Sequence, residues 1–273
     1  MNVALIISVY KDVENLKVIL DSLRFQTYRD FEIVISEDGR YEGMKTFVET
    51  YPFANPVKHI TQNDEGWRKN KALNNAIRST HADYLIFIDG DCVPHHKFIE
   101  NHVRLSSPQG IVAGKRVKLG PVYSDRFKKN IGQLPELEKK VQWELSGMKK
   151  DGAQFYEEVF YFEPGSMFGF IPKLRKMKYL KGCNMSFHRS AIEAINGFDE
   201  DYELPAVGED ADLKWRFEGL GYKLISARNL AVQYHLYHKE NWMDQSVNLA
   251  KMRANMMKNK FVCENGLHKI SLT

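Results

Sequence analysis

Apolar runs alternate with amphipathic stretches through the first 120 residues, and the two patterns predict strands and helices in turn. A run such as residues 3–9, which is apolar almost throughout, is typical of a parallel strand buried on both faces. The predicted strands are residues 3–9, 31–36, 57–61 and 84–88, and the predicted helices are residues 13–23, 45–51 and 67–80. This alternation predicts an α/β fold with a mostly parallel, doubly wound central sheet flanked by helices.

The pattern is less regular in the carboxyl-terminal half. Strands are predicted at residues 111–114, 115–119, 179–187, 222–227 and 231–234, and helices at residues 95–106, 134–150, 189–195, 210–220 and 240–261. Residues 155–180 are rich in Phe, Tyr, Pro and Gly and predict a long irregular segment, which in a compact chain is usually functional or partly disordered. No Pro/Gly/Ser-rich linker divides the chain, so we expect residues 1–273 to form one domain.

The strand at residues 84–88 ends in two acids, Asp89 and Asp91, which flank Gly90. Acids at the carboxyl end of a buried strand lie where open α/β sheets bind ligands. A divalent cation that holds substrate phosphates would offset the repulsion between two close carboxylates, and Mg²⁺ or Mn²⁺ suits oxygen ligands. The same residues are also compatible with an Asp-Gly turn that closes the strand.

Composition narrows the function classes and the compartment. The formal net charge of +4 and the pI near 8.7 permit an anionic ligand or membrane surface without requiring one. Three cysteines without a CxxC spacing indicate a reducing compartment. The chain has neither a secretory signal nor an apolar run near the ~18 residues of a membrane span, so we expect a cytoplasmic protein. No helix-turn-helix, zinc or RNP pattern indicates a nucleic-acid partner.

Residues 173–181 mix cations with apolar residues beside the irregular segment. Such a stretch suits contact with an anionic membrane or a lipid diphosphate, which would place the protein at the inner face of the membrane. A solvated loop is the simpler interpretation, and the pattern alone leaves both open.

Several motifs in order resemble those of family 2 glycosyltransferases with the GT-A fold. The amino-terminal motifs are Ile7-Ser8-Val9-Tyr10-Lys11, Phe31-Glu32-Ile33-Val34-Ile35-Ser36-Glu37-Asp38-Gly39 and Phe87-Ile88-Asp89-Gly90-Asp91. Asn196-Gly197-Phe198-Asp199-Glu200 and Val207-Gly208-Glu209-Asp210-Ala211-Asp212 resemble the carboxyl-terminal half of galactosyltransferase-like and chondroitin-polymerase-like members. The resemblance covers roughly residues 1–120 and 180–240, and ordered motifs are more specific than any single one.

The resemblance implies a nucleotide-sugar donor bound by the first half of the chain, residues 1–120. It assigns the base to Ser8, Tyr10 and Asp38, with Asp89 near the ribose. Lys71 and Arg68 lie on the helix before the central strand, where a cation could meet the base, a phosphate or a sugar hydroxyl. Each position has a simpler interpretation. Tyr10 could be a packing aromatic, Asp38 a turn residue and Lys71 part of a solvated helix face.

The resemblance also implies a divalent metal, Mn²⁺ or Mg²⁺, on the donor diphosphate. Asp91 is the expected direct ligand, whereas Asp89 would bind the ribose or reach the metal through water. A further ligand is expected from a histidine after the Glu-Asp motif, and we favour His235 over His238. A plain surface or core histidine remains the alternative for both.

Residues 121–273, with the carboxyl-terminal helix, would form the acceptor and catalytic half. The resemblance assigns Asp210 as the base that takes the acceptor proton and Glu209 as a residue that holds a sugar. Gly182 and Asn184 would line the donor-sugar site. Because acids are also favoured at helix starts, simple capping is the alternative for Asp210.

These expectations describe a metal-dependent inverting transferase that moves a hexose or N-acetylhexosamine from a UDP-sugar to a glycan or lipid-linked acceptor, as in surface polysaccharide synthesis. The alternatives are an inactive glycan- or nucleotide-binding module of the same fold and a nucleotidyltransferase. The latter needs a Gly-rich phosphate loop after the first strand, and residues 8–13 do not form one. The intact acids argue against the inactive module.

Overall fold

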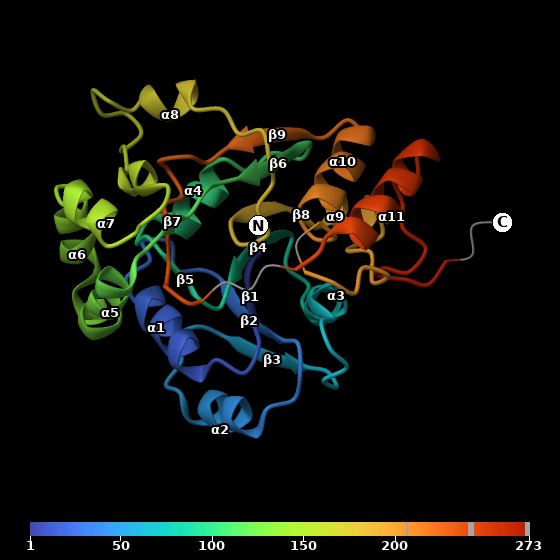
Figure 1. The fold of residues 1–273 in the computed structure, drawn as a ribbon, viewed down its shortest axis with the longest axis horizontal. Helices are drawn as coiled ribbons and strands as arrows, with labels where there is room; N and C mark the ends of the chain where they lie inside the picture. Colours follow the sequence, from blue (N-terminus) through green and yellow to red (C-terminus); the bar gives the residue numbers. More distant parts are fainter. Residues whose placement is uncertain (206, 240–242, 271–273) are drawn as a thin grey trace.

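A seven-stranded mixed sheet forms the centre of the molecule, with helices against both faces (Figure 1). The structure is a computed structural model that describes residues 1–205, 207–239 and 243–270. The sheet has the strand order β3-β2-β1-β4-β8-β6-β9, and a second sheet has the order β5-β10-β7. In the seven-stranded sheet, β3, β2, β1 and β4 run parallel to one another. The next strand, β8, is antiparallel to both β4 and β6.

The element bounds follow the sequence pattern closely in the first half. The strands are β1 Val3–Val9, β2 Glu32–Glu37, β3 Val57–Thr61, β4 Tyr84–Asp89, β5 Cys92–Pro94, β6 Gly110–Ala113, β7 Val117–Lys118, β8 Met185–His188, β9 Lys223–Ser226 and β10 Gln233–His235. The helices are α1 Val13–Leu23, α2 Glu42–Thr50, α3 Lys69–Ser79, α4 Phe98–Arg104, α5 Pro121–Asn130, α6 Leu134–Val141, α7 Leu145–Lys150, α8 Ile171–Leu174, α9 Arg189–Ala194, α10 Ala211–Gly219 and α11 Ser246–Met257. Short 3-10 helices lie at Ile131–Gln133 and Tyr156–Val159.

The central strands are buried on both faces, as their unbroken apolar runs predict. Leu5 and Ile7 of β1 pack with α1 and with the α5–α7 region, whereas Ala4 and Ile6 pack with α3, α9 and α10. The sheet therefore separates two hydrophobic clusters, and its carboxyl-terminal edge stays open to solvent between the flanking helices.

Three predicted elements differ from the structure. The strand predicted at 179–187 is reduced to β8, because residues 181–184 turn, with the Asn184 amide donating to the Lys181 carbonyl at 2.9 Å. The helix predicted at 134–150 is two helices, because Glu144 in the turn between them binds Arg126 and Tyr123 of α5. The helix predicted at 240–261 spans only α11, and residues 240–242 lie outside the described residues.

The second sheet was not expected as a separate unit, because its three strands are each only two or three residues long. β5 follows the central acidic motif directly and pairs antiparallel with β10, with Cys92 opposite His235. The Leu236 amide then donates to the Asp91 carbonyl at 2.8 Å. This pairing brings residues 140 positions apart in the sequence to one place.

We expect Arg216→Met to lower the free energy of unfolding by about 3–5 kcal/mol, because it leaves Asp212 as a buried charge without its cation. Arg216 is 1% exposed and its Nε lies 2.6 Å from Asp212 Oδ2. Lys214→Met on the same helix is the control, since Lys214 pairs with Glu218 near the surface and should cost less than about 1 kcal/mol. Chemical denaturation of both variants measures the difference, and equal losses would contradict it.

Candidate active site

A cleft with a volume of about 650 Å³ lies at the carboxyl edge of the central sheet. Parallel register places Ser8 of β1 opposite Ser36 of β2 on one side and opposite Asp89 of β4 on the other. The ends of three strands therefore meet there, which is the ligand-binding edge of an open α/β sheet. The cleft is lined by Ser8, Val9, Tyr10, Asp12, Asp38, Gly66, Trp67, Lys69, Asp89, Gly90, Asp91 and His238.

Gly90 lets the two acids turn into this cleft. Its amide donates to the Ser8 carbonyl at 2.7 Å, which ties the end of β4 to the end of β1. A Cβ atom at Gly90 would lie 2.7 Å from Val9 Cγ1, so any other residue would force the strands apart. The close approach thus requires glycine.

Aromatic and acidic side chains form one end of the cleft. Tyr10 is half exposed and its hydroxyl donates to Asp64 at 3.2 Å, while Trp67 lines the same cleft. Asp38 is buried and accepts hydrogen bonds from Gln62 Nε2 and the Arg68 amide, both at 2.8 Å. Burial raises the pKa of Asp38 despite these two donors. This end offers aromatic faces and an oriented carboxylate to a planar polar ligand.

Asp91 contacts two histidines at the other side of the cleft. Its Oδ2 lies 3.3 Å from Nε2 of His235 and 3.2 Å from Nε2 of His238, and the two ring nitrogens are 3.3 Å apart. Burial favours the neutral acid, but hydrogen bonding to His235 and His238 holds the pKa of Asp91 well below its ordinary value. From the sequence we favoured His235 over His238 as a metal ligand, whereas in the structure both histidines contact Asp91.

The three atoms have the spacing of ligands on one face of a metal ion. Two ligand atoms about 2.1 Å from an octahedral cation lie about 3 Å apart when they are adjacent. One carboxylate with two imidazoles is an established ligand set that leaves further positions open. Asp91, His235 and His238 therefore fit a divalent cation that keeps positions for substrate oxygens.

Lys69 joins the two chemical centres of the cleft. Its Nζ lies 2.7 Å from Asp89 Oδ1 and 2.8 Å from Glu209 Oε2. Burial opposes the charge of Lys69, but Asp89 and Glu209 raise its pKa well above the ordinary value. Arg116 approaches the other oxygen of Asp89 at 3.6 Å. Asp89 is thus held by two cations, so the structure gives it fewer free lone pairs than Asp91 for a metal.

Glu209 and Asp210 lie side by side in sequence and face the turn at residues 181–184. Asp210 Oδ1 accepts the Gly182 amide at 2.6 Å, and Lys181 Nζ is 3.7 Å from Oδ2. A Cβ at Gly182 would lie 2.9 Å from Asp210 Oδ1, so a larger residue would displace the Asp210 carboxylate. Burial raises the pKa of Asp210, and burial with the neighbouring Asp210 and Asp89 charges raises the pKa of Glu209 to about 7.

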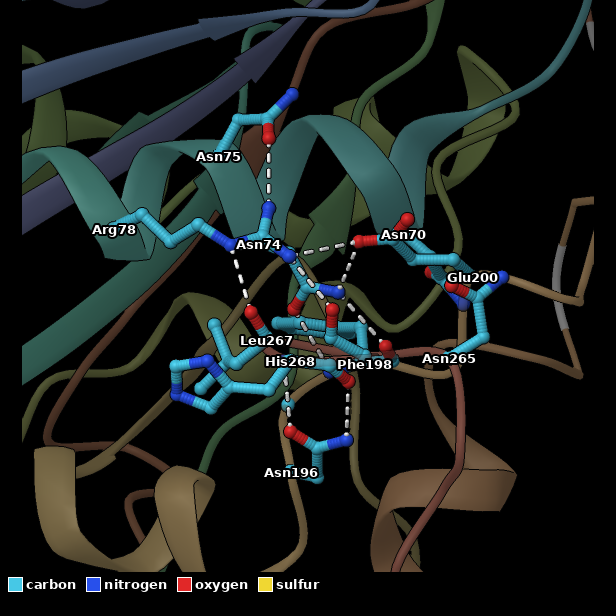
Figure 2. A network of polar contacts seen from close by, with 12 residues as sticks. Asn70, Asn74, Asn75, Arg78, Asn196, Phe198, Glu200, Asn265, Leu267 and His268 are labelled. Carbon is cyan, nitrogen blue, oxygen red and sulfur yellow. Dashed lines mark hydrogen bonds and ion pairs between the residues drawn. The ribbon is translucent and has the colours of Figure 1, made fainter. Parts of the chain in front are cut away.

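Asparagines of α3 hold the segment that leads to this acid pair (Figure 2). Asn74 exchanges two hydrogen bonds with the backbone of Phe198, at 2.9 and 3.0 Å. Asn70 Nδ2 donates to the carbonyl of Gly208 at 3.2 Å, directly before Glu209. Because α3 also begins with Lys69, one helix positions both the cation and the backbone that carries the acids.

The carboxyl-terminal loop packs against the same helix (Figure 2). Arg78 of α3 donates to the carbonyls of Gly266 and Leu267, at 2.6 and 2.9 Å. Asn196 Nδ2 donates to the carbonyls of Cys263 and His268, both at 2.8 Å. Residues 263–268 therefore close around the turn at 196–200 and help to keep it against α3.

Two predicted site residues lie elsewhere. Lys71 does not line the cleft, and its Nζ instead lies 3.7 Å from Glu65 at the surface. Asn184 is fully buried, and its Nδ2 donates to the carbonyls of Lys115 and Ala231. Its amide hydrogens are thus engaged within the fold, which is a correction to its expected contact with sugar hydroxyls. The other predicted residues fall into three groups. The cleft is lined by Ser8, Tyr10, Asp38, Asp89 and Asp91, whereas His235 and Glu209 contact residues that line it, and Gly182 and Asp210 contact each other next to Glu209.

Sequence reasoning missed Lys69 and Arg116 as site residues. Lys71 was chosen on this helix instead, although Lys69 and Lys71 point about 200° apart around the helix axis. Lys69 is the first residue of α3, where a side chain reaches the carboxyl ends of the strands. Arg116 stands between two short strands, and no motif distinguishes it from other surface cations.

Comparison with known proteins identifies the family. The profile described as Glycosyl transferase family 2 matches residues 4–177. The chain therefore belongs to this family. Similar curated proteins include glycosyltransferase AglE of Haloferax volcanii, 31% identical over 40% of this chain and 36% of that protein. Chondroitin synthase of Escherichia coli is 22% identical over 89% of this chain and 36% of that protein. The chain spans about a third of the length of these relatives.

Solved structures with the same architecture are GT-A glycosyltransferases. A mannosyltransferase from Pyrobaculum calidifontis in complex with GDP-Man and Mn²⁺ has a TM-score of 0.56 and 19% identity, covering 94% of this chain and 62% of that one. GalNAc-T7 with UDP, GalNAc and Mn²⁺ has a TM-score of 0.60 and 14% identity, covering 89% and 45%. The likeness confirms the GT-A fold. Among the described residues, no helix has the length and hydropathy of a membrane span.

We expect wild type to lose stability relative to Glu209→Gln as the pH rises from about 4.5 to about 7. The pKa of Glu209 is about 7 in the folded protein against an ordinary value of 4.5, so folding favours the protonated form. The stability that Glu209 contributes in its protonated form is fully present below its pKa in the unfolded chain. This stability is lost as the pH rises through its pKa in the folded protein. The full difference is about 3 kcal/mol.

Denaturant unfolding at a series of pH values measures this dependence. Glu218→Gln, which removes a more exposed carboxylate from α10, is the matched control. Identical pH slopes for wild type and Glu209→Gln would contradict the raised pKa of Glu209.

Proposed function

We propose that the protein is a metal-dependent, inverting glycosyltransferase that takes a sugar from a nucleotide-sugar donor, with a UDP-sugar as the expected donor. The observation that carries this proposal is the arrangement of one cleft. Asp91 contacts His235 and His238, and Lys69, which lines the same cleft, links Asp89 to Glu209, the neighbour of Asp210. A donor diphosphate bound at Asp91 and its two histidines would present its sugar to Glu209 and Asp210.

The nucleotide would bind at the aromatic end of the cleft. Tyr10 and Trp67 offer ring faces for a base, and the Asp38 carboxylate can accept a ring N–H such as that of uracil. The Gln62 side chain and the backbone N–H of Arg68 already orient the Asp38 carboxylate. Less conformational entropy is therefore lost when Asp38 binds a base. This end therefore supports recognition of a pyrimidine nucleotide.

The diphosphate would lie over Asp91 and its two histidines. A Mn²⁺ or Mg²⁺ ion held there would act as a Lewis acid: it would neutralise phosphate charge and so stabilise the leaving nucleotide. Lys69 and Arg116 supply further positive charge at Asp89. In this proposal Asp89 would orient these cations and meet the ribose.

Asp210 would act as the base of the transfer step. The acceptor hydroxyl oxygen attacks the anomeric carbon, the bond from that carbon to the phosphate oxygen breaks, and the hydroxyl proton passes to Asp210. The Gly182 amide and Lys181 hold this carboxylate from the opposite side. Its raised pKa favours proton uptake at neutral pH, and such catalysis contributes about 10²–10⁴-fold. Glu209, next to it, is placed to bind a sugar hydroxyl.

The acceptor is proposed to be a glycan or a lipid-linked glycan, as in the synthesis of a surface polysaccharide. This proposal is supported by the family and by relatives named chondroitin synthase and hyaluronan synthase. The matched region is 36% or less of the length of each of these relatives. A binding module without turnover is the competing proposal, and transfer assays separate the two.

We expect UDP to bind more tightly with Mn²⁺ than without it, and Asp91→Asn to remove that gain, because the carboxylate supplies the charge of the ligand set. His235→Ala and His238→Ala should each weaken Mn²⁺ binding by about 10–100-fold, a loss typical of residues that hold a metal. Calorimetric titration of Mn²⁺ and UDP measures both effects.

His81→Gln is the control, since His81 is exposed and does not line the cleft. Mn²⁺ binding that is unchanged in both histidine variants would rule out the proposed ligand set. UDP binding that is independent of Mn²⁺ and of Asp91 would rule out the metal-dependent donor site.

We expect Asp210→Asn to lower kcat for sugar transfer by at least about 10²-fold while donor affinity stays within a few-fold, because the amide cannot accept the proton. Donor binding is followed by calorimetry, and transfer by nucleotide release in the presence of candidate acceptors. Asp201→Asn is the control for loss of a carboxylate in the same half of the chain. Transfer at the wild-type rate would show that Asp210 is not the base.

A further inference from the structure

We propose that the α6–α7 turn and the segment at residues 164–179 form one docking face for an anionic membrane surface. Both features lie on the same side of the molecule, at the left and upper left of the ribbon in Figure 1, where α6, α7 and α8 are drawn. The active-site residues take no part in this face. The inference therefore stands apart from the transfer reaction proposed above.

The α6–α7 turn exposes a tryptophan among lysines. Trp143 is 90% exposed, although large apolar side chains of this size are usually at least half covered. Lys139 and Lys140 close α6, and Lys149 and Lys150 close α7. All four lysines are exposed, and none forms an ion pair with a described residue. A tryptophan beside several lysines is the combination that favours the headgroup layer of a membrane.

The segment at residues 164–179 repeats this chemistry in a second place. Its exposed apolar side chains are Met167, Phe168, Phe170, Leu174 and Tyr179, which are 51–79% exposed. Residues 164–192 contain no acid, and Glu163 just before them is paired with Lys97. Lys173, Lys176 and Lys178 are exposed and form no ion pair within the described ranges. The segment thus presents apolar groups and uncompensated positive charge together.

A groove of about 540 Å³ lies beneath the segment. Leu105, Met177 and Leu224 supply part of its apolar lining, and Arg104, Lys173 and Lys176 supply cations. An apolar hollow with cations at its wall suits an anionic lipid, whose chain and headgroup need both kinds of contact.

An anionic membrane fits this face better than a folded protein partner. Lysines alternate with apolar residues at 173–179 and flank Trp143 in the sequence, so the face lacks the charge-depleted apolar centre of a stable protein interface. Seven lysines without ion pairs, each contributing about 1 kcal/mol near an anionic surface, would together supply most of the binding. The inserted aromatic side chains would add the apolar contribution that keeps the protein at the interface.

Co-sedimentation with phosphatidylcholine vesicles, with and without phosphatidylglycerol, tests the proposal on the intact chain. We expect binding only to vesicles that contain phosphatidylglycerol, and weaker binding at high salt. The Trp143 emission should shift to shorter wavelength on binding, and Trp143→Phe should remove this shift. Binding to neutral vesicles at equal strength, or to neither, would overturn the proposal.

Two pairs of substitutions locate the face. Lys149→Gln with Lys150→Gln should weaken vesicle binding about thirtyfold, and Phe168→Ser with Phe170→Ser should weaken it at least about tenfold. Arg253→Gln with Lys258→Gln removes the same charge from exposed positions in α11 and directly after it, and should weaken binding much less. Equal losses in the α11 control would overturn the assignment of this face.

Other outcomes separate this face from competing explanations. Self-association that depends on the same lysines and phenylalanines, without vesicle binding, would show that the face joins two copies of the chain and would overturn the membrane proposal. Vesicle binding needs neither donor nor metal. Its failure would therefore leave the proposed transfer reaction untouched, and failure of transfer would leave vesicle binding untouched.

Discussion

The buried lysine between two acids is the interaction on which the rest of the cleft depends. Lys69 contacts Asp89 at the end of β4 and Glu209 before α10, so it joins the two halves of the chain through charge. Removing one member of such a group leaves an uncompensated buried charge, which is costly. The asparagines of α3 add neutral hydrogen bonds to the same segment, so position and charge are set by one helix.

A second constraint comes from backbone pairing. β5 leaves the acidic motif and pairs with β10, and this ladder ends where His235 faces Asp91. The ligand set is therefore built on strands, and strands hold side chains more precisely than loops. His238 comes from the following loop and is more exposed, so it completes the set from the open side of the cleft. The two histidines differ in rigidity although both contact the same carboxylate.

The fold was largely predictable because its signals are local. The apolar runs of β1 and β4 and the acids after β4 are readable from adjacent residues, and the GT-A fold followed from ordered motifs. Short strands such as β5 and β7 carry too few residues for a period to show. Lys71 was misassigned for a different reason: Lys69 and Lys71 point about 200° apart around the helix, and their residue type alone does not say which of them faces the strand ends.

The sequence by itself determined the sheet, the family and the acids of the cleft, because burial period and motif order are properties of neighbouring residues. Only the tertiary structure decided which cation joins the acids, that both histidines reach Asp91, and that Asn184 serves the core. Those choices depend on pairs far apart in the chain. The distances within these pairs are set by strand pairing and helix packing, which cannot be inferred from any single stretch of sequence.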